Sequence, residues 1–547
     1  MMEYNLPQTP KILSPKDNEI FMLTNGDLRE SANTNCWPVQ QEYEEKLKVA
    51  LKEYCNLDLV RIHDVDSKKG HGFISSQREG SDILAKIDSE APLIILLTAW
   101  QYSHHIAPSL VHHKGPILVL ANFDGTWPGL VGALCLSGTL NSLECKHSRL
   151  WSENFNDNFF IDGLKSWVKT GEIHHDLSYL KPVSDDTHLL KTEAGEFGKN
   201  LGEWVLQNKE IMGIFDSFCM GMINGVFPQK ALCDIGMPME GLSQSALAYE
   251  MSLVTQQEKE DCLNWYIDQG MNFHFGHDDA TELTKEQVLE QCAMLIAMTR
   301  FVDRFKLSLI GVQYQQGLKD VCPASDFAEG AIGSKIRYPV KDDEGKIIHE
   351  GKPIPCANEV DLGTAIHQLM LYRILDSLNL PSETTLHDVR WGSEYNGQFY
   401  WDFEISGAVP FEHIKGGIKG AQGYRQSPMY FAKGGSTIGG QCKKGHFVWA
   451  RASYLGDEVH MHIGTGEAFE LPEDEFQRRL NATTKEWPLM NATLHGMGRD
   501  DLMAGHQSNH ITIAYVDEKY LAFVTNAFVA MALTQNMRVW LAGEPKI

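Results

Sequence analysis

The sequence lacks three features that would place the protein outside the cytoplasm or in a membrane. It has no CxxC pair, no basic head followed by a continuous apolar run, and no apolar stretch of the roughly 20 residues that a membrane helix needs. Its 11 cysteines are scattered and odd in number, which favours reduced thiols over a disulfide framework or a zinc knuckle. The longest apolar runs, at 91–100 and 115–123, are about half as long as a membrane helix and predict buried strands. We therefore expect a cytoplasmic protein with no membrane partner.

Positive charge is also scarce. The chain has 48 Lys and Arg against 72 Asp and Glu, which gives a formal net charge of −24. This balance argues against nucleic acid as a partner, because binding to phosphates depends on Lys and Arg. The 547 residues are 43% hydrophobic and 10% aromatic, which is enough to fill several ordinary cores. We therefore expect an ordered protein of several domains.

The predicted secondary structure changes along the chain. Short apolar segments alternate with helical stretches up to about residue 170 and again after about residue 175, which is typical of parallel βαβ units. From about residue 385 the pattern is strand-rich, and it is followed by a helix expected at 518–534 and a last strand, MRVWL. The predicted fold class is α/β, with two Rossmann-like α/β domains followed by a C-terminal antiparallel β-barrel domain. The predicted domains are residues 1–172, 173–355 and 356–547.

The Gly-rich and His-rich segments predict no cofactor by themselves. GGSTIGG and KGGIKG lack both the Lys-Ser/Thr of a phosphate loop and the GxGxxG of dinucleotide binding, so no nucleotide cofactor is expected. His460 and His462 would lie on one face of a strand and could share a metal, although solvated or hydrogen-bonded histidines are commoner. The spacing of His506 and His510 fits a helix, yet the flanking glycine and ITIAYV favour a loop that enters a strand. At most one of these two should face a site.

Two carboxylates at predicted strand ends are more informative. Glu359 follows PIPCAN and precedes a helical stretch, and Asp388 ends the next strand candidate. Side chains at the carboxyl ends of neighbouring strands converge on the ligand crevice of an open α/β sheet, so these two acids could meet at one point. Asp361 is a competing candidate, and a strand-end acid is more often a helix cap or an ion-pair partner. From spacing alone, both interpretations stay open.

Six segments in the second half of the chain occur in a characteristic order: IGVQYQQGLKDVCPASDFAEGAIGS, CANEVDLGTAIHQLM, LHDVRW, EISGA, the WP of KEWPLMNATLHG, and HQSNHITIAY. Together they resemble the successive signatures of the L-fucose isomerase family. Two earlier segments are similar to the family as well: LIILLTAWQYSHHIAPSLVHHKGPILVLANFDGTWPG and GIFDSFCMGMINGVFPQKALCDIGMPMEGL. The resemblance covers most of residues 90–545, and it rests on the shared order of weak motifs.

The resemblance implies a manganese-dependent aldose–ketose isomerase with two α/β domains and a C-terminal β-barrel, assembled as a homo-oligomer, usually a hexamer. It implies that Glu359, Asp388 and His510 hold the metal. The metal would be Mn²⁺, with Mg²⁺ or Co²⁺ as alternatives. The residues that it places against the sugar are Ser406, Asn509, Gln313, Met220, Trp100 and Trp487, with Trp100 reaching the site of a neighbouring subunit. Where the family carries an Ile-Arg-Pro whose Arg binds substrate, this chain has FMLTNGDLRES, so Thr24, Asn25 or Arg29 would replace that Arg.

The chemistry of these ligands agrees with isomerisation. Two carboxylates and one imidazole suit Mn²⁺ or Mg²⁺ and leave about three octahedral positions for two sugar oxygens and a water. A cation bound to both oxygens would acidify the C2 proton and stabilise a cis-enediol(ate), while Glu359 and Asp388 act as acid and base. The expected substrate is a free monosaccharide such as a 6-deoxyhexose or a pentose. Two alternatives stay open: a metal-dependent epimerase or lyase on a related sugar or sugar acid, and a non-catalytic carbohydrate-binding homologue.

Overall fold

The computed structural model describes residues 9–184, 187–217 and 219–547. The chain divides into two compact units, Met1–His175 and Asp176–Ile547, and each is described by itself. The boundary predicted near residue 355, inside the second unit, stays a prediction. Across the described residues, no helix combines the length and the apolar character needed to cross a bilayer.

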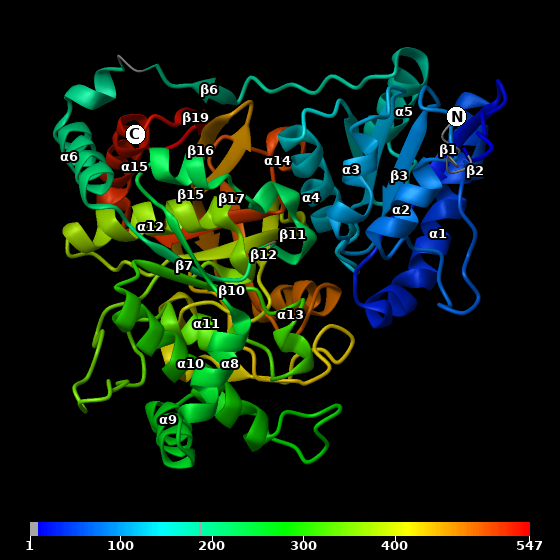
Figure 1. Ribbon diagram of the computed structural model, residues 1–547. Coiled ribbons are helices and arrows are strands. Elements are labelled where there is room, and N and C mark those ends of the chain that lie inside the picture. The colour runs from blue at the N-terminus through cyan, green and yellow to red at the C-terminus, as the bar shows by residue number, and fades with distance from the viewer. Residues whose placement is uncertain (1–8, 185–186, 218) are drawn as a thin grey trace, which may run out of the picture. The chain divides into compact units, whose positions relative to one another are not determined.

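Unit 1 is built on a five-stranded parallel sheet in the order β2-β1-β3-β4-β5, coloured blue to cyan in Figure 1. The strands are β1 (Glu19–Leu23), β2 (Asp58–Arg61), β3 (Leu93–Leu97), β4 (Ile117–Asn122) and β5 (Ser148–Ser152). The two long apolar runs of the sequence supply β3 and β4, which are buried throughout, so the prediction of buried strands is confirmed. The helices are α1 (Glu30–Cys55), α2 (Gln77–Leu84), α3 (Ala107–Leu110), α4 (Gly129–Ser142) and α5 (Asn158–Thr170).

Unit 2 contains a smaller parallel sheet of three strands in the order β10-β7-β8. These strands are β7 (Met212–Phe215), β8 (Met239–Leu242) and β10 (Leu309–Val312). Three helices lie between β8 and β10 in the chain: α8 (Gln244–Leu253), α9 (Gln256–Gln269) and α10 (Lys285–Phe305). The segment 242–269 is helical in pattern, and the chain forms two helices there; Thr255 separates them, and its side chain caps α9 in a capping box with Glu258.

The strand-rich C-terminal part of the sequence, together with the earlier strand β6, forms one mixed sheet of nine strands, in the order β14-β17-β12-β11-β18-β15-β16-β19-β6. Its strands are β6 (Leu180–Pro182), β11 (Thr385–Tyr395), β12 (Gln398–Glu404), β14 (Gly440–Gln441), β15 (Gly445–Leu455), β16 (Glu458–Phe469), β17 (Pro488–Leu494), β18 (His510–Tyr515) and β19 (Arg538–Ala542). β17 pairs with both β12 and β16. The mixed α/β class is confirmed, whereas a closed antiparallel barrel stays a prediction.

Three helices pack with this sheet in a hydrophobic core of unit 2: α6 (Glu193–Asn208), α12 (Leu362–Ser377) and α15 (Glu518–Thr534). The helix predicted at 518–534 is confirmed by α15. α6 and α15 lie side by side (Figure 1) and approach very closely at Gly198, where an added Cβ would stand 2.0 Å from the carbonyl oxygen of Ala527. The core therefore joins segments from both of the domains predicted for residues 173–547.

Candidate metal centre

The three predicted metal ligands come from distant parts of unit 2, and two of them, Glu359 and Asp388, lie beside the imidazole of the third, His510. Asp388 lies on β11 and His510 is the first residue of β18, and the two are direct partners across this antiparallel pair. Glu359 lies in a short 3-10 turn, Asn358–Val360, which leads into α12. The sheet register therefore brings Asp388 beside His510, and the turn before α12 adds Glu359.

The contacts are made through Nε2 of His510. This atom lies 3.2 Å from Oδ1 of Asp388 and 3.4 Å from Oε2 of Glu359, yet neither contact has the geometry of a hydrogen bond. The imidazole is fully buried, while the Glu359 and Asp388 side chains are 13% and 15% exposed. The two carboxylates thus separate a buried nitrogen from solvent and remain reachable by a ligand.

The other ring nitrogen faces Asp361, the acid that competes with Glu359 in the sequence. Oδ2 of Asp361 lies 2.8 Å from Nδ1 of His510. The Asp361 side chain also accepts a hydrogen bond from the backbone N–H of Gly363 at 2.8 Å, which caps α12. Asp361 is therefore a helix cap and a partner of His510 on the side away from the two carboxylates.

The electrostatics of this group of side chains favour positive charge on His510. Burial by itself would lower the pKa of His510, but Asp388, Asp361 and Glu359 outweigh it and raise the pKa well above its usual range. Burial would also raise the pKa of Asp361, yet Arg451 and His510 hold it below its usual range. A proton on the ring therefore takes the place that a bound cation would fill, and cation binding would release that proton.

Two of the predicted sugar-binding residues are linked to Glu359 by a chain of hydrogen bonds. The hydroxyl of Ser406 lies 2.7 Å from Oδ1 of Asp326 and 3.5 Å from Oε1 of Glu359. The Gln426 amide donates to the backbone carbonyl of Ser406, and its oxygen accepts from the Trp487 indole at 2.8 Å. Ser406 and Trp487 therefore lie on one connected polar wall beside Glu359.

The other predicted sugar-binding residues of unit 2 are Asn509, Gln313 and Met220. Asn509 donates to Oδ1 of Asp388 at 3.0 Å, so it holds a predicted ligand in place. Gln313 directly follows β10 and is buried. Met220 is buried in a short turn, Cys219–Gly221, that contacts the turn carrying Glu359.

Trp100 and the three candidates for the missing Arg belong to unit 1. Trp100 is buried, and its indole nitrogen has no hydrogen-bond partner among the residues that the structure describes. Arg29 pairs with Asp27 at 2.7 Å, Asn25 donates to the side chain of Gln101, and Thr24 donates to a backbone carbonyl. Contact of Trp100 with a sugar stays a prediction.

Two buried acids beside the cluster were missed by reasoning from the sequence. Asp326 and Glu329 lie on α11 (Asp326–Ile332), a short helix whose residues are all buried. Burial, reinforced by the Glu359 charge, raises the pKa of Asp326 to about 7. Burial and Asp326 raise the pKa of Glu329 to about 8, and Glu329 accepts a hydrogen bond from Asn358 at 2.7 Å. The signal was present in DFAEGAI, where two acids three residues apart stand among apolar residues.

The donor set suits a hard divalent cation. Two ligands at right angles on an octahedral ion, each bonded at about 2.1 Å, lie about 3.0 Å apart. The distances of 3.2 and 3.4 Å around Nε2 of His510 are close to that spacing. As placed, however, no group of three or more His, Cys, Asp or Glu side chains in the described part of the chain could hold a metal ion. Binding would therefore require the two partly exposed carboxylates to turn toward the ion.

Comparison with known proteins adds nothing to these motifs. A scan against protein-family models gave no match, and a search of characterised proteins gave none. The resemblance to L-fucose isomerases stays a prediction from the order of the motifs.

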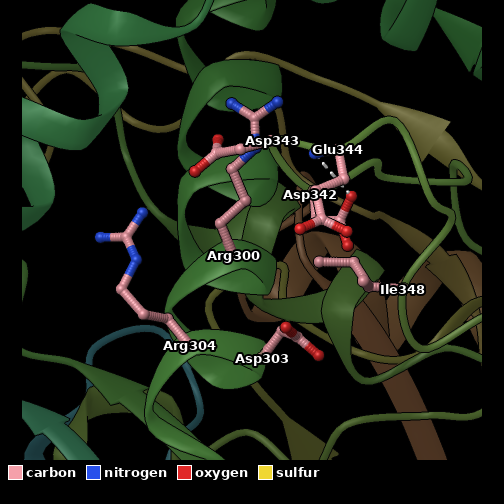
Figure 2. Close-up of a pocket in the computed structure, with 7 residues that line it drawn as sticks. All are labelled: Arg300, Asp303, Arg304, Asp342, Asp343, Glu344 and Ile348. Carbon is pink, nitrogen blue, oxygen red and sulfur yellow. Dashed lines mark hydrogen bonds between the residues drawn. The ribbon is translucent and has the colours of Figure 1, made fainter.

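A pocket of about 280 Å³ on the surface of unit 2 shares no residue with this cluster. Figure 2 shows Asp342, Asp343 and Glu344 on a loop that faces α10, which carries Arg300 and Arg304. Both arginines are already paired, Arg300 with Glu258 at 2.6 Å and Arg304 with Glu250 at 3.0 Å. The remaining lining residues are Asp303 and Ile348. With its arginines neutralised and its loop acidic, the pocket offers no free cationic group to an anionic ligand.

Proposed function

We propose that the protein is a metal-dependent aldose–ketose isomerase that acts on a free monosaccharide, such as a 6-deoxyhexose or a pentose. One observation carries the proposal: the buried Nε2 of His510 faces two partly exposed carboxylates without hydrogen bonding to either. This is the environment expected of a nitrogen that shares a cation with two acids. The order of the L-fucose isomerase-like motifs supports the same assignment.

In this proposal Glu359, Asp388 and His510 hold a divalent cation, Mn²⁺ with Mg²⁺ or Co²⁺ as alternatives. The ion would supply Lewis acidity at the sugar carbonyl. Glu359 and Asp388 would move one proton between C2 and C1, and such positioned acids and bases typically contribute about 10²–10⁴ in rate. Their partial exposure, beside a fully buried imidazole, lets them reach a substrate.

The surrounding residues would bind and orient the sugar. Ser406 and Trp487 belong to the polar wall beside Glu359, and Asn509 donates to Asp388. Ser406 donates to Oδ1 of Asp326. Because burial raises the pKa of Asp326 to about 7, part of the population carries a proton near neutral pH; that carboxyl could donate to Ser406 instead and free the hydroxyl to donate to Glu359 or to a sugar oxygen.

The test is turnover of a panel of aldoses in D₂O by protein stripped with EDTA and reloaded with Mn²⁺. We expect a ketose that carries deuterium at C1, no turnover by the stripped protein, and no turnover by Glu359→Gln, which should still bind metal more weakly. Glu394→Gln removes an exposed acid from the same strand as Asp388 and should keep full activity. If the Mn²⁺-loaded protein converts no aldose in a broad panel, the proposal is wrong.

A further inference from the structure

We propose that the buried pair of Asp361 and Arg451 is a positioning device that fixes the ring of His510 and thereby sets the affinity of the cluster for a divalent cation. The inference rests on the proposed function in one respect, that His510 is a metal ligand. It adds two residues that the sequence motifs do not assign to metal binding. It also explains why the acid two residues after Glu359 points away from the ion of the proposed function.

The first step is the contact between Asp361 and the ring. Oδ2 of Asp361 lies 2.8 Å from Nδ1 of His510, and the same oxygen accepts from a guanidinium N–H of Arg451. Both side chains are fully buried, so no water competes for the carboxylate. A carboxylate at Nδ1 keeps the hydrogen on that nitrogen, and the lone pair then lies on Nε2. Nε2 is the atom that faces Asp388 and Glu359.

The second step is that Asp361 itself cannot turn. Its Oδ1 accepts from the backbone N–H of Gly363 and so is fixed to the start of α12. Arg451, on β15, also donates to the backbone carbonyl of Asn224 at 3.1 Å. An added Cβ on Gly363 would stand 2.6 Å from Nη2 of Arg451, so the guanidinium packs directly on the first turn of α12. The start of α12, the strand β15 and the short 3-10 turn Ile223–Gly225 together hold the carboxylate that orients the ring.

A purely structural role is the competing explanation, because a buried ion pair also matters for folding. Unit 2 contains a matched pair that separates the two explanations. Asp402 and Arg479 are likewise fully buried and lie 3.0 Å apart, and Asp402 accepts a further hydrogen bond from Asn491. The ion pair of Asp402 with Arg479 and the hydrogen bond from Asn491 do not involve His510, Glu359 or Asp388.

The test compares Asp361→Asn with Asp402→Asn in the full chain after removal of metal with EDTA. Asparagine at 361 keeps the oxygen that caps α12 but turns an N–H₂ toward the ring, which favours the tautomer with hydrogen on Nε2. We expect the Kd for Co²⁺, measured by calorimetry, to rise about 10- to 100-fold, and the visible absorption band of bound Co²⁺ to shift. Asp402→Asn should lower the Tm yet leave the Kd within twofold and the band in place.

Two results would overturn the inference: a Kd within twofold of the unaltered chain for folded Asp361→Asn, or an equal loss of affinity in Asp402→Asn. If Asp361→Asn does not fold, pulsed EPR of the unaltered chain loaded with Cu²⁺ replaces it. We then expect modulation from the remote nitrogen of one imidazole, with a quadrupole coupling shifted from that of free imidazole by the bond to Asp361. An unshifted coupling, or no imidazole modulation, would contradict the proposal. Neither measurement depends on turnover. If the chain binds Co²⁺ as expected but isomerises no sugar, the proposed function is wrong, while the inference about Asp361 and Arg451 still stands.

Discussion

Glu359 and Val360 are consecutive residues that both adopt left-handed backbone, with φ of 56° and 58°. This conformation is costly for any residue with a Cβ and is rare for a β-branched one such as Val360. Such strain persists only where the surrounding structure enforces it, and it concentrates at functional sites. Here it turns the Glu359 carboxylate toward His510 at the point where the chain enters α12.

The strain at Glu359 predicts an unusual order of stability in the metal-free protein. Glu359→Ala and Glu359→Gly both remove the carboxylate, but glycine relieves the left-handed backbone at the cost of a more flexible unfolded chain. We expect Glu359→Gly to be more stable than Glu359→Ala by about 0.5–1 kcal/mol. Urea unfolding in the presence of EDTA measures the difference.

Asn358 supplies the control for this comparison, because it lies beside Glu359 and is not among the residues with positive φ. Asn358→Gly should be no more stable than Asn358→Ala, since the hydrogen bond to Glu329 is lost in both. Equal stability of the two Glu359 variants would show that the backbone at this position carries no strain.

The buried acid Glu329 predicts a loss of stability at alkaline pH. Its pKa is raised from 4.5 to about 8 in the folded chain, so the folded state binds more protons than the unfolded state between these values. The stabilisation is complete below about pH 4.5 and is lost as the pH rises through about 8. We expect the free energy of unfolding of metal-free protein to fall by roughly 2–4 kcal/mol between pH 5 and 9 because of this group.

Glu329→Gln is the corresponding variant, because glutamine resembles the protonated acid. Urea unfolding at a series of pH values should show a flatter profile for this variant, with a residual slope from Asp326, whose pKa is also raised. Glu344→Gln, at an exposed position, should follow the unaltered profile. If the free energy of unfolding of Glu329→Gln fell with pH as steeply as that of the unaltered chain, Glu329 would not be neutral in the folded protein.

The close approach of α6 and α15 predicts intolerance of a single methyl group. In Gly198→Ala the new Cβ would stand 2.0 Å from the backbone oxygen of Ala527, and only a backbone shift can relieve that contact. We expect a loss of about 1–3 kcal/mol, despite the higher helix propensity of alanine. Gly241→Ala, where nothing lies within 4 Å of the added atom, should change stability by less than about 0.5 kcal/mol. Equal Tm values for the two variants would contradict this packing.

Local patterns in the sequence were sufficient to predict those helices and strands that depend on neighbouring residues alone. The apolar runs predicted β3 and β4, and the periodic segment at 518–534 predicted α15. The break at Thr255 was missed because it depends on one capping residue within an otherwise helical pattern. The nine-stranded sheet was beyond prediction in detail, since its pairing joins residues as distant as 182 and 540.

The candidate cluster was predictable through its motifs but not through its spacing. The pairing of Asp388 with His510 depends on sheet register across more than a hundred residues, which periodicity does not reveal. Asp361 carried two interpretations in the sequence, and only the structure shows that it contacts the opposite nitrogen of the ring from Glu359. Asp326 and Glu329 were missed because their raised pKa values come from complete burial, which a short motif does not predict.

The pairing of β6 with β19 also bears on how the chain is made. Leu180–Pro182 leaves the ribosome before its partner strand, Arg538–Ala542, which is translated some 350 residues later. During that interval the apolar face of α6, which is destined for α15, stays uncovered on the nascent polypeptide. Unit 2 can therefore be completed only after β19 has been translated, and we expect α6 to be shielded by chaperones until then.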